Sequence, residues 1–412
     1  MRPERLLAAL ADRPWPALAS FRGCTVVAAD PVETVVGEAA WDALGRPADP
    51  AAAGGAAAIA GGWIGLLAYD LAGGLERLPA PLPDPGGPPV AALARHDAVA
   101  IIDRDGRCTL ASAGGRRPLA ALARAVERSH GIRLPAAGTP PQGTAVESSL
   151  DAAAYRDAVE RVRELIRAGD CYQVNLCQRL TAAWRESPLA LARGLWAAAG
   201  PSSHRAFLGL PGGAVVSASP ERLVRLDDGA AASEPIKGTA AAGASAALRA
   251  SAKDRAEHVM IVDLVRNDLG RVARPGSVLV SRLMDPLPTA YVDHLVSEVR
   301  AELREGAGPR ELLRAVFPGG SVTGCPKVRA MEVIRELEPV GRGPAYGSVV
   351  AVGRDGSLEA SVAIRTAWAA GAEARYWCGG AVVWDSDPEA ERREAWAKAA
   401  PFLQAIGAPA PG

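Results

Sequence analysis

Two segments of the chain carry paired carboxylates at helical spacing. Asp254 and Glu257 are three residues apart in KDRAEHVMIVDLVRND. Glu391 and Glu394 repeat that spacing in DSDPEAERREAWAK, and Lys398 follows four residues later. Residues three or four positions apart share one face of a helix, and magnesium binds carboxylate oxygens while keeping several waters. The pattern therefore allows a magnesium site, and its alternative is a solvated acidic surface, which is common at this spacing.

A lysine in a tight apolar segment could serve as a nucleophile. Lys237 lies between Ile236 and Gly238 in EPIKGT, and Glu221 stands earlier in SPERL. Desolvation lowers the pKa of a lysine and leaves a neutral, nucleophilic amine. Glu221, if it is buried as well, could hold or deliver a proton. The alternative is a turn with an exposed lysine, because lysines mostly lie on the surface.

An arginine in an apolar run and a glycine-rich turn complete the candidate polar features. Arg365 stands in VAIRT, where a guanidinium could bind a substrate carboxylate or pair with a structural one. The run FPGGSVTGCPK superficially suggests a phosphate loop. It departs from that pattern because Pro326 separates its last glycine from Lys327, and Val328 stands where a metal-binding Ser or Thr is needed. The turn could still present backbone N–H groups to an anion.

The elements that would position these residues alternate in no regular order. Periodicity predicts helices over Asp151–Ala168, Ala247–Leu269, Pro309–Val316, Val328–Leu337 and Pro388–Ile406. Apolar runs predict strands over Val174–Leu180, Ala214–Ser217, Tyr346–Val352, Ala360–Trp368 and Arg375–Trp377. This favours an α+β fold over a doubly wound one. Residues 134–149 have the composition of a linker, so we expect an N-terminal lobe over 1–145 and a catalytic domain over 146–407.

The overall charge balance limits what the chain can bind. Lys plus Arg and Asp plus Glu number 46 each. No global field then attracts nucleic acid or an anionic membrane, so a local cluster must hold any anionic substrate. No apolar stretch reaches the roughly 18–20 residues of a bilayer span, and the N-terminal apolar run is too short for a signal peptide. We therefore expect a cytoplasmic protein.

Taken together, these segments resemble the chorismate-utilising enzymes, which include component I of anthranilate synthase, component I of aminodeoxychorismate synthase, and the isochorismate and salicylate synthases. The matching blocks are GDCYQVNLCQR, SPERL, PIKGT, DRAEHVMIVDLVRNDLGRV, DHLVSEV, FPGGSVTGCPKVRAMEVI, VAIRTAW and CGGAVVWDSDPEAERREAWAK. They span Gly169 to Lys398, and GGWIGLLAYDL resembles the family's first lobe. The resemblance implies two large antiparallel sheets packed as a sandwich with flanking helices.

The resemblance also implies roles for individual residues. Glu257 and Glu394 match magnesium carboxylates, and Glu391 and Asp254 match their neighbouring or water-bridged partners. Glu221 matches the acid/base near the leaving hydroxyl of chorismate. The residues that match substrate-binding positions are Arg365, Tyr346, Gly379, Gly380, Lys398, His294, Thr239 and Gln173.

Two positions separate the reactions within the family. Enzymes that add water at carbon 2 of chorismate carry a lysine where this chain has Gln173, so the resemblance argues against isochorismate and salicylate synthases. The corresponding block of anthranilate synthases resembles PIAGT, whereas this chain has PIKGT. A lysine at this position is typical of aminodeoxychorismate synthase. In that reaction the amine attacks carbon 2 as the carbon 4 hydroxyl leaves, and ammonia then attacks carbon 4. We therefore predict a depressed pKa for Lys237.

The resemblance thus implies the reaction of aminodeoxychorismate synthase component I, a magnesium-dependent transferase that supplies 4-aminobenzoate and folate biosynthesis. The chain contains no glutaminase nucleophile motif, so we expect ammonia from a separate glutamine amidotransferase subunit or from solution. Component I of anthranilate synthase is the nearest alternative. An alternative from another class is a non-catalytic chorismate-binding subunit, which the full set of matched catalytic residues argues against.

Overall fold

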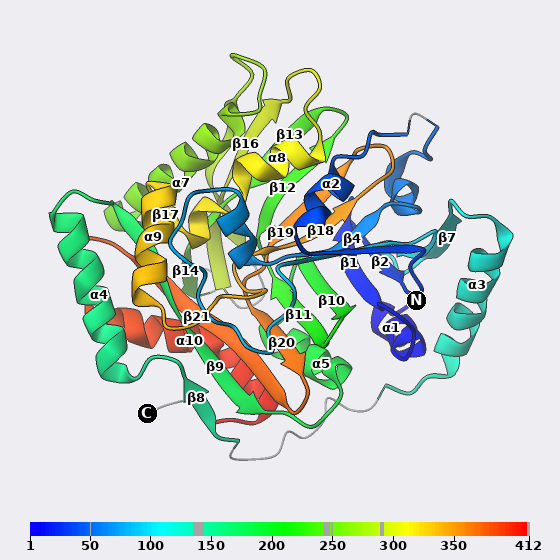
Figure 1. The fold of residues 1–412 in the computed structure, drawn as a ribbon, viewed down its shortest axis with the longest axis horizontal. Coiled ribbons are helices and arrows are strands. Elements are labelled where there is room, and N and C mark those ends of the chain that lie inside the picture. The colour runs from blue at the N-terminus through cyan, green and yellow to red at the C-terminus, as the bar shows by residue number, and fades with distance from the viewer. Residues whose placement is uncertain (50, 135–143, 242–247, 249, 289–291, 410–412) are drawn as a thin grey trace.

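Two antiparallel sheets form the centre of the molecule (Figure 1). The computed structural model describes residues 1–49, 51–134, 144–241, 248, 250–288 and 292–409. One sheet has eleven strands and the other ten. Buried residues from both sheets, such as Phe21 and Val215 from the first and Ile64 and Val350 from the second, belong to one apolar cluster. The predicted α+β sandwich is therefore confirmed.

The eleven-stranded sheet, called sheet A here, contains the strands on which the C-terminal glycines lie. Its strands, in spatial order, are β17 (Gly324–Cys325), β9 (Gln173–Ala183), β21 (Glu373–Val382), β20 (Thr366–Ala370), β11 (Gly213–Ser219), β10 (His204–Leu210), β1 (Ala17–Phe21), β2 (Cys24–Ala28), β6 (Ala98–Ile102) and β7 (Cys108–Ser112). A further strand, β8 (Val146–Ser148), pairs with β9. The first 145 residues thus extend a sheet that later residues begin.

The ten-stranded sheet, called sheet B here, contains the strand that carries the predicted nucleophile. Its strands, in spatial order, are β14 (Ile236–Ala241), β16 (Val292–Glu302), β13 (Ala230–Glu234), β12 (Arg222–Asp227), β19 (Leu358–Val362), β18 (Ser348–Val352), β4 (Trp63–Leu67), β5 (Ala91–Arg95) and β3 (Glu33–Val36). The remaining strand, β15 (Leu279–Pro288), pairs with β16. N-terminal strands complete this sheet too, and the division between residues 145 and 146 stays a prediction.

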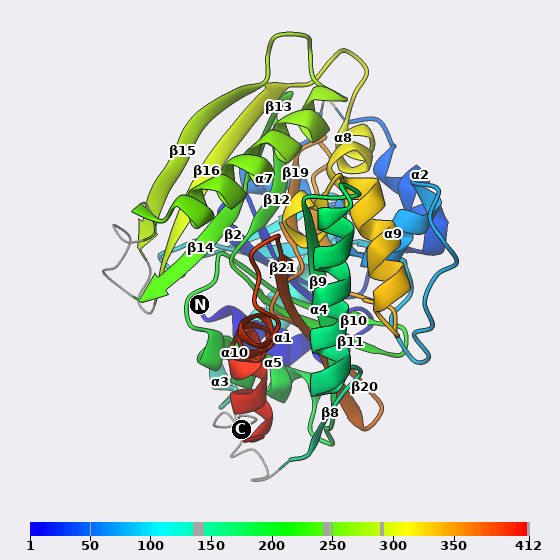
Figure 2. The same ribbon diagram turned by 90° about the vertical axis from the view of Figure 1, so that its left-hand side faces the viewer.

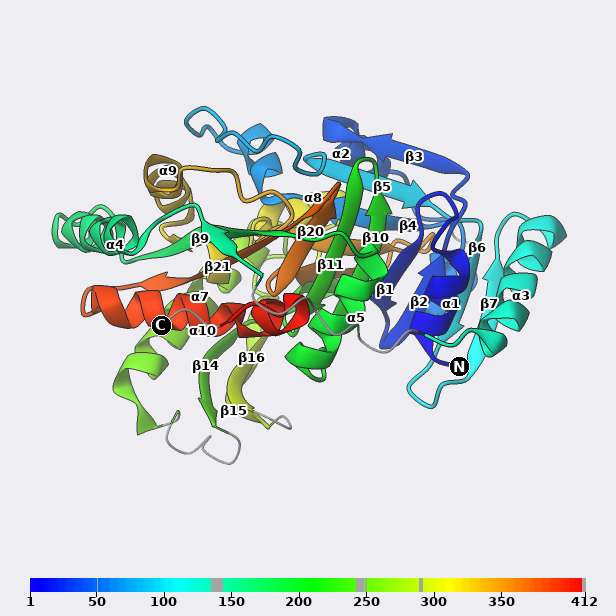
Figure 3. The same cartoon turned by 90° about the horizontal axis from the view of Figure 1, so that it is seen from below.

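Helices cover both sheets and carry the acidic segments. They are α1 (Pro3–Leu10), α2 (Ala40–Leu44), α3 (Arg116–Gly131), α4 (Ala152–Arg167), α5 (Pro188–Ala199), α7 (Ala252–Gly270), α8 (Pro309–Val316), α9 (Lys327–Leu337) and α10 (Pro388–Ile406). Figure 3 shows α1, α3, α5 and α10 along one side of sheet A, where their apolar residues share a single cluster. Figure 2 shows α7 beside β14, β15 and β16. No helix in the described ranges has both the length and the apolar character of a membrane span.

Local signals explain why α10 begins and ends where the sequence predicts. The Asp387 side chain accepts a hydrogen bond from the backbone N–H of Ala390 at 2.8 Å, and Pro388 occupies the first turn. Both features favour a helix start. Gly407 ends the helix with a φ of +68°, a conformation that glycine adopts without steric cost. These boundaries fix where Glu391, Glu394 and Lys398 point.

The predicted strand Ala360–Trp368 is wrong, because the chain changes sheets within it. Residues up to Val362 belong to β19 in sheet B, and residues from Thr366 belong to β20 in sheet A. Arg365 lies at the crossing with a φ of +50°. A non-glycine residue in the left-handed region costs free energy and is held there by its surroundings. Arg365 is therefore fixed at the junction of the two sheets.

Candidate active site

The predicted nucleophile lies on the edge strand of sheet B against a carboxylate of α7. Lys237 belongs to β14, which pairs with β16, and α7 contacts both strands. Lys237 Nζ lies 3.9 Å from Glu257 Oε2, and the two side chains are only 16% and 18% exposed. The alternative of an exposed turn lysine is therefore excluded, because β14, β16 and α7 together enclose the side chain.

The surroundings of Lys237 favour its neutral form. Burial lowers the pKa of the ammonium, and the positive charge of Lys398 acts in the same direction. The carboxylates of Glu257, Glu221 and Glu394 oppose this shift without cancelling it. A lysine with a depressed pKa holds a larger fraction of nucleophilic amine near neutral pH. The predicted depression of this pKa is present.

Glu221 provides a buried proton-exchanging group next to this lysine. It follows β11, is 6% exposed, and accepts a hydrogen bond from Ser321 Oγ at 2.8 Å. Burial raises the pKa of its carboxyl to about 7, although the Ser321 hydrogen bond and the charge of Lys237 lower it. A carboxyl with a pKa near neutrality can both give and take a proton under ordinary conditions. Glu221 therefore has the properties of a general acid.

Helix α10 carries the second predicted pair of carboxylates, Glu391 and Glu394. Glu394 Oε1 and Lys398 Nζ are 2.7 Å apart, and both side chains are about half exposed. Lys398 Nζ also donates to the backbone oxygen of Gly379 at 3.0 Å, which ties α10 to β21. Glu391 is buried and accepts from Ser386 Oγ at 2.6 Å. Helix α10 thus presents the half-exposed carboxylate of Glu394 and the buried carboxylate of Glu391, which Ser386 holds in place.

Two glycines of β21 lie where a larger side chain would not fit, next to the charged groups of α10 or against the neighbouring strand. A Cβ at Gly380 would lie 3.0 Å from Glu391 Oε2 and 3.7 Å from both Glu394 Oε1 and Lys398 Nζ. Glu391, Glu394 and Lys398 therefore converge over Gly380. A Cβ at Gly379 would lie only 2.0 Å from the backbone oxygen of Leu176 on β9. Gly379 is thus required for strand pairing, and Gly380 leaves room beside the charged groups.

The carboxylates suit a hard cation in number and kind. Both Glu257 of α7 and Glu394 of α10 act electrostatically on Lys237, so the two acidic helices flank one centre. Among the described residues, no three His, Cys, Asp or Glu side chains gather into a complete metal cage. Magnesium requires no such cage, since it is bound through one or two carboxylates with waters and substrate oxygens as further ligands. The donor set fits that mode of binding.

Two polar side chains near the sheet ends have no partner among the residues that the structure describes. Arg365 is half-buried, and its guanidinium forms no hydrogen bond or ion pair with any residue that the structure describes. The alternative of a structural Arg–carboxylate pair is therefore not found in that part of the chain. Gln173 is fully buried, and neither its Oε1 nor its Nε2 has a partner within the described ranges. Unsatisfied buried polar groups are costly and often mark a ligand site.

Comparison with known proteins decides the family. A family described as chorismate binding enzyme matches residues 17–404. The chain belongs to the chorismate binding enzymes. It is 39% identical over 362 residues to anthranilate synthase component 1 of Thermus thermophilus, covering 84% of this chain and 77% of the relative. It is also 39% identical over 350 residues to aminodeoxychorismate synthase component 1 of Klebsiella aerogenes, covering 82% and 75%.

Solved structures agree on the fold. Anthranilate synthase component I from Streptococcus pneumoniae superimposes with a TM-score of 0.80 at 25% identity, covering 95% of this chain and 92% of that one. The protein is therefore a chorismate-utilising enzyme of the group that contains anthranilate synthase component I and aminodeoxychorismate synthase component I. Relatives of both kinds are equally similar, so the distinction between them rests on the site.

The remaining predicted site residues of this family member are His294, Tyr346, Thr239 and Asp254. His294 on β16 is buried, and its Nδ1 lies 3.1 Å from the backbone oxygen of Gly238, next to Lys237. Tyr346 is buried with the Arg342 guanidinium 4.8 Å from its ring centroid. Thr239 lies on β14 and Asp254 on α7, but their side chains fall outside the described residues. Their roles stay predictions.

Several supporting residues escaped prediction from the sequence. Ser321 in the glycine-rich turn donates to Glu221, so the turn supplies a hydrogen-bond partner for this buried carboxyl. Lys327, at the end of that run, is buried and donates to Asp268 of α7 at 2.6 Å. The only available signal was the spacing of glycines around Ser321, which marks a tight backbone rather than a partner. Lys327 anchors α9 to α7, and α7 in turn carries Glu257.

Proposed function

We propose that the protein is component I of an aminodeoxychorismate synthase, which replaces the carbon 4 hydroxyl of chorismate with an amino group. The observation that carries this proposal is the position of Lys237. Its amine lies in a buried setting with a lowered pKa, between Glu257 and Glu221. A neutral amine in such a position is suited to nucleophilic attack on a conjugated ring. An enzyme that only activates ammonia has no need of it.

The proposed reaction proceeds in two balanced displacements. The lone pair of Lys237 forms a bond to carbon 2, the ring π electrons shift, and the carbon 4–oxygen bond breaks. Glu221, with a pKa of about 7, gives its proton to the departing oxygen, which leaves as water. Ammonia then bonds to carbon 4, the π electrons shift back, and the carbon 2–nitrogen bond breaks. The lysine returns as a neutral amine and the proton released from ammonia recharges Glu221.

Other residues of the chain would hold the substrate during these steps. The unpaired guanidinium of Arg365 and the backbone N–H groups near Gly379 and Gly380 would bind its carboxylates. Glu257 and Glu394, supported by Glu391 and Asp254, would hold Mg²⁺. When bound, magnesium neutralises a substrate carboxylate and so eases electron flow into the ring. Gln173, which lacks a basic group, would contact the ring without activating water.

The ammonia would come from a glutamine amidotransferase subunit. The name component 1 belongs to relatives of both kinds, and we propose that this chain likewise works with a separate partner. Free ammonia at high concentration should replace that partner, because the reaction chemistry resides in the chorismate site. The product, 4-amino-4-deoxychorismate, would then serve 4-aminobenzoate and folate formation.

Anthranilate synthase component I is the second candidate. It is favoured by the equal identity of its relatives and by the Streptococcus pneumoniae structure. The two reactions differ in the carbon that receives nitrogen and in the fate of the enolpyruvyl group. A covalent lysine is required only for amination at carbon 4. The enclosed position of Lys237 therefore favours the first candidate.

A product assay separates these candidates. Purified protein is incubated with chorismate, magnesium and ammonium salt, and the products are resolved by chromatography with mass detection. We expect 4-amino-4-deoxychorismate and no anthranilate. Anthranilate formed without a lyase would overturn the proposal in favour of anthranilate synthase. Chorismate binding without any turnover would instead identify a non-catalytic subunit.

A further inference from the structure

A surface cleft lies between α1 and α3, far from the chorismate site. In Figure 1, α1 and α3 lie at one end of the molecule and β14 with α7 at the other. The cleft has a volume of about 350 Å³, and its apolar lining residues, called its floor here, include Leu10, Ala29, Ala98, Leu122 and Ala125. Small alanines on the floor leave space where larger side chains would fill it. The cleft thus combines this apolar floor with charged side chains on the outer side of sheet A.

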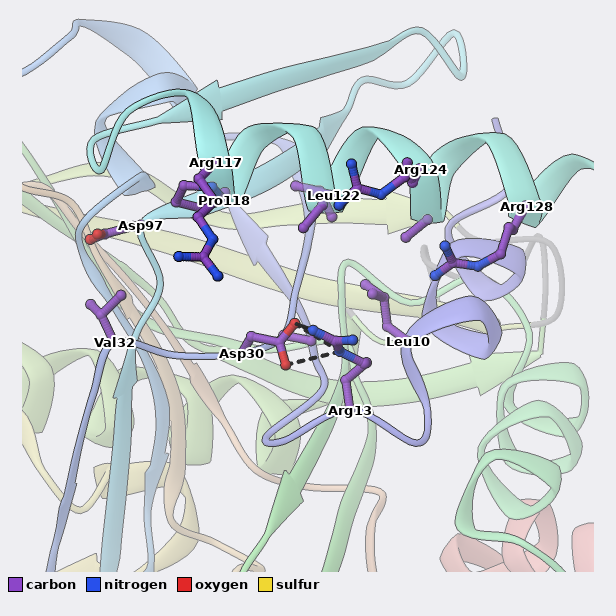
Figure 4. A pocket seen from close by; sticks show the side chains of 14 residues that line it. Leu10, Arg13, Asp30, Val32, Asp97, Arg117, Pro118, Leu122, Arg124 and Arg128 are labelled. Carbon is purple, nitrogen blue, oxygen red and sulfur yellow. Dashed lines mark hydrogen bonds and ion pairs between the residues drawn. The ribbon is translucent and has the colours of Figure 1, made fainter.

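Arginines surround this apolar floor. Arg117, Arg124 and Arg128 line the cleft from α3, at spacings of seven and four residues that place them on one helix face. Figure 4 shows Arg117 and Arg128 extending from α3 over the gap. Within the described part of the chain, none of these three guanidiniums has a hydrogen-bond or ion-pair partner. Three cations therefore face the cleft without protein anions to neutralise them.

The carboxylates that line the opposite side of the cleft are already paired with arginines. Arg13, after α1, donates to Asp30 in three hydrogen bonds of 2.7 to 3.0 Å. Asp97, also on the rim, lies 3.4 Å from Arg95. These two carboxylates are thus occupied by other arginines. The guanidiniums of α3 therefore give the cleft an excess of positive charge.

We propose that the α1–α3 cleft binds a small organic dianion, such as a phosphate ester or a dicarboxylate, that carries an apolar body. Guanidiniums bind carboxylate and phosphate oxygens in bidentate fashion, which suits the three unpaired arginines. The apolar floor would cover a hydrocarbon or aromatic group, as small-molecule sites commonly do. The volume accommodates a single substituted ring. This second site is independent of the chorismate reaction and of the lysine that the reaction uses.

Binding of simple probes to the full chain tests this proposal. Titration calorimetry is performed with phenyl phosphate, phthalate and inorganic phosphate, without magnesium. We expect saturable binding of phenyl phosphate or phthalate with a Kd near or below about 1 mM, and weaker binding of inorganic phosphate, which lacks an apolar body. The tighter of the two aromatic probes identifies phosphate esters or dicarboxylates as the ligand class. Equal binding of inorganic phosphate would overturn the role of the apolar floor, and no saturable binding would overturn the site.

Three variants assign the binding to the cleft. The double variant Arg117→Gln/Arg128→Gln should weaken binding by up to about 25-fold, because each exposed guanidinium contributes up to about fivefold. Arg116→Gln removes the same charge from α3 outside the cleft and should bind as wild type. Arg365→Gln alters the chorismate site and should also bind as wild type. Loss of binding in Arg365→Gln, or wild-type binding in the double variant, would overturn the proposal. Unchanged chorismate turnover in the double variant verifies that it is folded.

Discussion

The protein contains the same chemical pair, a lysine beside a glutamate, in two settings. Lys237 and Glu257 lie 3.9 Å apart with 16% and 18% of their side chains exposed. Lys398 and Glu394 lie 2.7 Å apart with 49% and 56% exposed. The closer pair is the more solvated one. The N–O distance alone would therefore suggest that the Lys398–Glu394 pair matters more for the chemistry, whereas burial points to the Lys237–Glu257 pair.

Burial, more than contact, decides what each lysine can do. Desolvation penalises a charged ammonium far more in the enclosed β14–α7 wall than on the surface of α10. The pKa of Lys237 is lowered for that reason. Solvent screens the Lys398–Glu394 pair, whose contribution is that of a surface ion pair. We infer that Lys237 reacts with the substrate and that Lys398 orients groups around it.

Removal of the Lys237 amine should produce the largest effect. Lys237→Ala is expected to lower the rate of 4-amino-4-deoxychorismate formation by at least about 10³-fold at saturating ammonia, because the covalent route is lost. Lys237→Arg retains the positive charge without a usable nucleophile and should be equally impaired. Steady-state rates of these two variants, measured by product chromatography, test both expectations. A wild-type rate in Lys237→Ala would refute the covalent role and leave the chorismate site intact.

The second expectation concerns the proton donor beside that lysine. Glu221→Gln should lower kcat by about 10² to 10⁴-fold, the usual contribution of a general acid. Because the pKa of Glu221 is about 7, wild-type kcat should fall as the pH rises through that value. The variant should lose this descending limb. A pH–rate profile that keeps the limb in Glu221→Gln would assign it to another group.

The same substitution should stabilise the fold at high pH. The pKa of Glu221 rises from an ordinary 4.5 to about 7 in the folded protein, so folding favours the protonated form. Its contribution to stability is greatest below its unfolded pKa and declines as the pH rises towards the folded one. The free energy of unfolding of Glu221→Gln should therefore exceed that of wild type by about 3 kcal/mol at about pH 8 and by little at about pH 4. Urea denaturation at both pH values measures the difference, and a pH-independent difference would contradict it.

The smallest effect is expected at the exposed pair. Lys398→Gln should lower kcat/KM by about tenfold or less, because a half-exposed ion pair contributes on the order of 1 kcal/mol. Added salt should weaken the wild-type contribution further, since surface charges are screened. Measurements of kcat/KM for wild type and Lys398→Gln in low and high salt test this expectation. A loss as large as that of Lys237→Ala would mean that exposure does not separate the two lysines.

The sequence predicted local structure well where local signals exist. Helices α8 and α10 have the predicted bounds, because proline at the first turn marks both starts and the Asp387 side chain also caps α10. The break at Arg365 was not predicted, because an apolar run looks like one strand whether or not it changes sheets. Nor does the apolar pattern reveal that β1 and β4 complete sheets begun by later residues, since strand partners are set by distant contacts.

The site shows the same division between local and distant information. Helical spacing placed Glu391, Glu394 and Lys398 on one face, as observed around Gly380. The enclosure of Lys237 could not be read from PIKGT, because α7 and β16 that surround it come later in the chain. Ser321 was missed because a serine hydroxyl has many potential partners and the fold alone selects Glu221.

The central claim is that Lys237 bonds covalently to the substrate, and peptide mass spectrometry tests it most directly. The protein is incubated with chorismate and magnesium in the absence of ammonia, quenched in acid and digested to locate any adduct. We predict a mass gain equal to chorismate minus water on the peptide that contains Lys237, no gain in Lys237→Arg, and disappearance of the adduct when ammonia is added. Absence of the adduct from ammonia-free protein that turns over fully once ammonia is added would contradict the claim.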